Sequence, residues 1–91
     1  MHKQLFDIIQ GGPDVYVKRL PYMGKSIHQA QALLPQGYHI RYVSSMSDYQ
    51  DKSEHPDDKQ YAVYNKNNYH SELIHLYVNN DVIDDTLEVT Q

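Results

Sequence analysis

The sequence predicts an α+β domain in which one main helix packs on a small mixed β-sheet, with a long polar loop after the first sheet strand. Three observations predict it: an apolar stripe with helical spacing at residues 27–34, an alternating run from Tyr38, and three short apolar runs after residue 59 that are rich in β-branched and aromatic residues. The chain has 91 residues, enough for one small core. We therefore expect a single domain over residues 1–91.

Residues 1–20 are expected to form an N-terminal extension or an extra element. The sequence GGPD at residues 11–14 predicts the end of whatever element comes first. Residues 15–20 alternate poorly, and Pro21 closes them. The apolar side chains before GGPD share roughly one helical face, which predicts a short helix or a terminal strand: Leu5, Phe6, Ile8 and Ile9.

The main helix is expected to begin after Ser26, a good N-cap residue that is followed three positions later by Gln29. Pro35 and Gly37 predict its end. Its stripe consists of Ile27, Ala30, Leu33 and Leu34. We expect this stripe to be buried against the sheet, on Ile40, Tyr42, Leu76 and Val89.

The strands are predicted from a period of two. Tyr38, Ile40 and Tyr42 fall on one face of the first strand. After a polar connection at residues 44–59, residues 60–65 predict a short strand. Residues 72–78 predict a central strand that pairs antiparallel with residues 82–89, since the sequence NND at 79–81 suits a hairpin turn.

Composition excludes several classes of function. The formal net charge is −4 and the basic residues are scattered, so we expect no nucleic-acid partner. No apolar run is long enough to span a bilayer, and the N-terminus lacks a basic region followed by an apolar one. We therefore expect a soluble protein with no membrane partner, and a cytoplasmic one if the chain is complete. No cysteine is available for disulfides or thiolate metal sites.

The sequence carries no catalytic motif. Its six histidines lack the spacing that would bring them together, and its paired aspartates lack the spacing of a calcium loop. There is no glycine-framed serine and no glycine-rich phosphate loop. We therefore expect no enzyme, no catalytic residue, no metal and no cofactor. Nine tyrosines favour half-buried sheet faces or a protein contact surface.

Several segments together resemble the potato inhibitor I family of serine protease inhibitors. They are Gly24-Lys25-Ser26, an alanine two thirds of the way along the helix, the strand YHIRY, the polar loop, and LIHLYVNNDVIDDTLEV. The resemblance covers residues 21–89 with the loop unaligned, so residues 21–91 would be an inhibitor-like core. In that family a helix packs on a small sheet, and a loop between two parallel strands is presented to the protease.

The resemblance implies a serine protease inhibitor that presents the loop after Val43. Tyr49 or Lys52 would fill the specificity pocket of the protease. The family's loop is supported by arginines from the strand that follows it, and this chain has Glu72, Ile74 and His75 in that region. The expected binding-loop residues are Met46, Asp48, Tyr49, Gln50, Asp51 and Lys52.

Three alternatives remain open. The chain could be a non-catalytic protein–protein interaction module, forming a homodimer or acting as a host-directed accessory protein through Tyr-rich strand faces. The text around the helix, LPYMGKSIHQAQALL, also resembles a PASTA domain, which implies a cell-wall ligand. Residues 44–59 could equally be a connection with no protease target.

Overall fold

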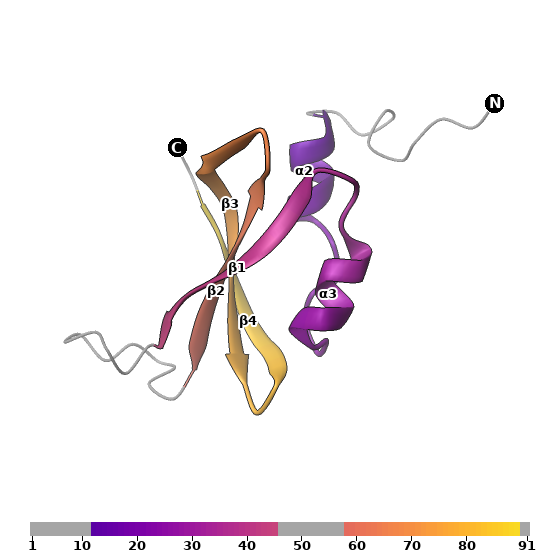
Figure 1. The fold of residues 1–91 in the computed structure, drawn as a ribbon. Coiled ribbons are helices and arrows are strands. Elements are labelled where there is room, and N and C mark those ends of the chain that lie inside the picture. The colour runs from indigo at the N-terminus through magenta and orange to yellow at the C-terminus, as the bar shows by residue number, and fades with distance from the viewer. Residues whose placement is uncertain (1–11, 46–57, 90–91) are drawn as a thin grey trace.

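The computed structural model of the chain describes residues 12–45 and 58–89. These residues form two short helices and a four-stranded sheet, as shown in Figure 1. In chain order the elements are α2 (Gly12–Lys18), α3 (Ile27–Leu33), β1 (Tyr38–Ser45), β2 (Lys59–Asn65), β3 (Asn68–Asn79) and β4 (Val82–Glu88). The α+β class is thus confirmed for the described part of the chain.

The sheet is antiparallel throughout, with the strand order β1-β2-β3-β4. The prediction of a mixed sheet is therefore wrong, and so is the expectation of parallel strands on either side of the long loop. The two-residue turns of β2–β3 and β3–β4 can join only antiparallel strands. The antiparallel direction of β1 against β2 is set instead by their long-range pairing. The predicted hairpin at the end of β3 is confirmed, because Asn80 and Asp81 take φ values of 52° and 66°.

The prediction of one main helix is wrong, because α2 and α3 have seven residues each. The element that GGPD was expected to end lies outside the described residues, and α2, which the sequence analysis did not predict, begins at Gly12. Proline is accepted in the first turn of a helix, where its missing N–H is not needed, and the carboxylate of Asp14 in that turn favours the helix dipole. Val17 of α2 is fully buried, so residues 12–18 contribute to the core.

Helix α3 begins and ends as predicted. The Ser26 hydroxyl accepts a hydrogen bond from the Gln29 N–H, and the Gln29 side chain accepts one from the Ser26 N–H, which completes a capping box. The expected stripe is only partly right. Ala30 is buried, but Leu33 is half-buried outside the core cluster, and Tyr42, expected beneath the helix, is 53% exposed. A seven-residue helix is too short to cover the whole sheet face.

Both helices lie on the same side of the sheet, with α2 against β3 and α3 against β1 (Figure 1). The buried tyrosine Tyr22, between the helices, donates a hydrogen bond of 2.7 Å from its hydroxyl to the Val17 carbonyl. Burial raises the pKa of the Tyr22 phenol, so this donor keeps its proton. The core lies between the two layers and comprises Val17, Tyr22, Ala30, Tyr38, Val63, Leu73, Ile74, Leu76, Val78 and Ile83.

Both edges of the sheet are partly covered from within the chain. On β4, the Ile83 N–H donates to the Lys25 carbonyl at 2.8 Å, and the Ile83 carbonyl accepts from the Gly24 N–H at 2.9 Å. On β1, the amide side chain of Gln31 accepts a hydrogen bond from the Ile40 N–H at 3.1 Å and donates one to the Tyr38 carbonyl at 3.2 Å. Gln31 thereby takes the place of a neighbouring strand over the first half of β1.

Candidate functional site

The six binding-loop residues predicted from the sequence lie outside the described residues, so the inhibitory loop stays a prediction. The residues that stand where loop-supporting arginines were expected have other contacts. Ile74 belongs to the core. Glu72 and His75 contact each other and side chains of β1 and β2.

The tyrosines whose side chains the structure describes do not gather on one strand face. Tyr22 and Tyr38 are core residues. Tyr42 and Tyr61 form an edge-to-face pair with ring centroids 5.4 Å apart, at positions opposite each other on β1 and β2. Tyr64 lies on the opposite face, which α2 and α3 leave uncovered. The predicted contact surface is therefore divided between the two sides of the sheet.

The side of the sheet opposite α2 and α3, here called the open face, carries a connected set of polar side chains. Arg41 donates to Glu72 at 2.5 Å, Glu72 and His75 share a hydrogen bond of 2.8 Å, and His75 and Gln60 share one of 3.0 Å. The Arg41 guanidinium also lies 5.7 Å from the centre of the Tyr64 ring. The hydrogen bond with His75, aided by Arg41, holds the pKa of Glu72 below its usual value, against a smaller opposing effect of burial.

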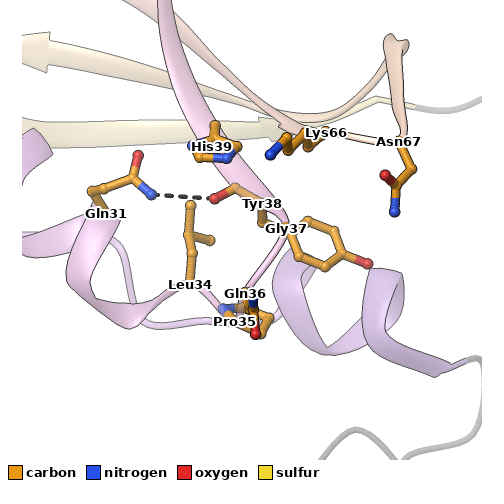
Figure 2. Close-up of a pocket in the computed structure, with 9 residues that line it drawn as sticks. All are labelled: Gln31, Leu34, Pro35, Gln36, Gly37, Tyr38, His39, Lys66 and Asn67. Atoms are coloured by element: carbon orange, nitrogen blue, oxygen red, sulfur yellow. Dashed lines mark hydrogen bonds between the residues drawn. The ribbon is translucent and has the colours of Figure 1, made fainter.

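A cavity of about 650 Å³ lies where α3 ends and β1 begins, next to the β2–β3 turn. We call it the corner pocket, and Figure 2 shows its lining. Its volume is within the range of small-ligand sites, which is about 300–1,000 Å³. The lining residues are Gln31, Leu34, Pro35, Gln36, Gly37, Tyr38, His39, Lys66 and Asn67.

Backbone contacts hold the walls of the corner pocket in place. The Tyr38 N–H donates to the Pro35 carbonyl at 3.2 Å, which closes a tight turn, and Gly37 in that turn has φ of +95°, a value that glycine adopts without strain. The Lys66 N–H donates to the Gly37 carbonyl at 2.6 Å, which ties the β2–β3 turn to this wall. A Cβ added at Gly37 would meet nothing within 4 Å, so this stretch of backbone faces open space.

The corner pocket combines hydrogen-bond donors with a small apolar area. Its donors include the Lys66 ammonium and the amide groups of Gln36 and Asn67, all on exposed residues, while Leu34 and Pro35 supply apolar surface. In Figure 2 the Lys66 side chain extends toward His39, with Leu34 below them. No described residue accepts a hydrogen bond from the backbone N–H of Gln36 or of Gly37. The lining therefore includes several hydrogen-bond donors, next to the carbonyl acceptors of the same amide side chains.

The charge of the lining distinguishes the corner pocket from two other cavities on the described residues. Each of the three contains one lysine. In the cavity with Lys18 the lining includes Asp14 and Glu72, and in the cavity with Lys59 it includes Asp81. Lys66 has no carboxylate beside it in the lining. The lining of the corner pocket thus carries one lysine and no carboxylate, although the Asp14 carboxylate accepts a hydrogen bond from the hydroxyl of the lining residue Tyr38.

Other kinds of site find no support in residues 12–45 and 58–89. Within these ranges, no group of three His, Asp or Glu side chains could hold a metal ion. Neither α2 nor α3 is long and apolar enough to cross a membrane. No protein family, no curated protein and no solved structure matches this chain.

The sequence analysis missed the corner pocket because its walls come from distant segments. Gln31 and Leu34 precede β1, whereas Lys66 and Asn67 follow β2. Gly37 was the available signal, since a glycine directly before a strand marks a special backbone conformation. The sequence alone gave no reason to place the turn at Lys66 next to Gly37.

Proposed function

We propose that this chain is a non-catalytic binding protein that holds an anionic group of a protein partner in the corner pocket. The observation that carries the proposal is the single ammonium group of Lys66 in a lining without a carboxylate. No carboxylate of the lining competes with an external anion for the Lys66 ammonium group. The nearby amide and backbone donors can complete the coordination of its oxygens.

A protein partner is supported by what surrounds the corner pocket. His39 lines the pocket and lies 6.0 Å, ring centre to ring centre, from Tyr64 of the open face. Arginine and tyrosine are enriched at protein interfaces, and here Arg41 and Tyr64 are already oriented by contacts within the domain. Arg41 and Tyr64 would therefore lose little conformational entropy when a partner bound at Lys66 contacts them.

The test is a titration of the ¹⁵N-labelled protein with sodium acetate at constant ionic strength, followed by NMR. We expect saturable shifts of the Gly37 and Asn67 amide signals, and their loss in Lys66→Gln. The matched control is Lys59→Gln, which removes the same charge at the other end of β2, in a cavity that contains Asp81. Shifts that fail to saturate, or that persist in Lys66→Gln, contradict the proposal.

Protease inhibition remains a second proposal that rests on the sequence resemblance alone, and the antiparallel pairing of β1 with β2 departs from the parallel strands of that family. Its contact residues lie outside the described residues. Its test is the inhibition of a protease and does not involve the corner pocket, so either proposal can fail without the other.

A further inference from the structure

We infer that the anionic group held in the corner pocket is the C-terminal carboxylate of a peptide chain whose last residue is apolar. The inference rests on the proposed function and specifies its ligand. Three features of the lining support it: its single ammonium group, the apolar surface next to its donors, and the way in which Gln31 occupies the edge of β1.

The charge of the lining matches a carboxylate better than a phosphate. Lys66 is the only Lys or Arg among the lining residues. A phosphate group carries between one and two negative charges at neutral pH, and proteins usually recognise it with clustered arginines. A carboxylate carries one charge, so a single ammonium group and a few neutral N–H donors are sufficient for it.

The apolar part of the lining lies next to the donors. Leu34 and Pro35 line the same cavity as Lys66 and Asn67, and both are half-buried with surface still open. The last residue of a peptide carries its carboxylate and its side chain on the same Cα atom. It can therefore place the carboxylate at Lys66 and an apolar side chain on Leu34 and Pro35 at once.

The edge of β1 favours the end of a chain over its middle. An extended peptide that crossed this corner as an added strand would need the Ile40 N–H and the Tyr38 carbonyl. Gln31 already uses both groups, at 3.1 and 3.2 Å. A chain that ends in the corner pocket needs neither of them, because its carboxylate is bound by Lys66 and the donors around it.

The experiment compares four probes by NMR on the full chain: acetyl-Gly-Ser-Ala-Leu with a free carboxylate, its C-terminal amide, acetyl-Gly-Asp-Ala-Leu amide, and inorganic phosphate. We expect the free acid to bind at least about tenfold more tightly than the other three. This corresponds to about 1.4 kcal/mol and is the usual scale of one charge-assisted contact. Replacing the final Leu of the peptide by Gly should weaken binding severalfold without any change to the protein.

The outcomes separate this inference from the proposed function. If the amide or the Asp-containing peptide binds as tightly as the free acid, or if phosphate binds more tightly, the C-terminal carboxylate is not the ligand and the inference is overturned. If acetate still binds in a manner that depends on Lys66, the proposed function survives that result. On the protein side, Leu34→Ala should weaken binding of the free acid more than binding of acetate, and equal loss of both contradicts the apolar contact.

Discussion

Replacing Gln31 by alanine should destabilise the domain although Gln31 lies outside the core cluster. Its side chain accepts a hydrogen bond from the Ile40 N–H and donates one to the Tyr38 carbonyl. No other described residue covers the edge of β1 at these two groups. Gln31→Ala therefore leaves a backbone donor and a backbone acceptor on a part-buried sheet edge.

The expected loss follows from the number of bonds. Each hydrogen bond contributes about 0.5–1.5 kcal/mol net, so two contribute about 1–3 kcal/mol. Alanine is the best helix former, which returns a few tenths of a kcal/mol in α3. Water can reach part of the edge and replace the lost partner, so we expect a net loss of about 1–2 kcal/mol. In a domain of this size that lowers Tm by roughly 4–16 °C.

The assay is urea unfolding followed by circular dichroism, with His28→Ala as the matched control. His28 lies in the same helix and is exposed, so its removal should change the unfolding free energy by less than about 0.5 kcal/mol. Gln31→Glu keeps an acceptor for the Ile40 N–H but places a carboxylate oxygen against the Tyr38 carbonyl, so it should also be less stable than wild type. If Gln31→Ala is as stable as His28→Ala, the edge-covering role is refuted.

Three further predictions concern other parts of the chain. Tyr22→Phe removes the donor to the Val17 carbonyl and should lower the unfolding free energy by about 1–2 kcal/mol, and an unchanged Tm contradicts this. The pKa of Glu72 is lower in the folded than in the unfolded protein, so its contribution to stability is complete above its unfolded pKa and is lost as pH falls through its folded pKa. Glu72→Gln should therefore reduce the loss of unfolding free energy at acid pH, measured by urea unfolding at several pH values. As a protease inhibitor, the protein should inhibit subtilisin or chymotrypsin at micromolar concentration, and Tyr49→Gly should weaken the binding free energy by more than about 1 kcal/mol. Rapid cleavage within residues 44–59 with full protease activity argues against inhibition.

The elements governed by local signals were predicted well. Ser26 and Gln29 form the expected capping box, and Asn80 and Asp81 form the expected turn. Both are contacts between near neighbours in sequence, where residue type decides the backbone conformation. The central strand was also found, because its apolar run contains Leu76 and Val78, which are buried in the core.

The parts decided by tertiary contacts were not predictable in the same way. The sequence GGPD is compatible both with the end of one element and with the beginning of another. In the structure it begins α2, whose Val17 is buried in the core. Strand direction between β1 and β2 depends on long-range pairing that the period-two pattern does not encode. The corner pocket depends on the hydrogen bond between Lys66 and Gly37, which joins segments far apart in the chain.

The most direct test of the corner pocket is to locate the bound probe by intermolecular NOEs. The ¹³C-labelled protein would be saturated with unlabelled acetyl-Gly-Ser-Ala-Leu, and contacts from the leucine methyl groups of the peptide would be assigned. We predict NOEs to Leu34 and Pro35, with further contacts to His39 or Lys66, because these residues line one cavity. NOEs to Tyr61 and Val78 instead, in the cavity that contains Lys59 and Asp81, would contradict the account.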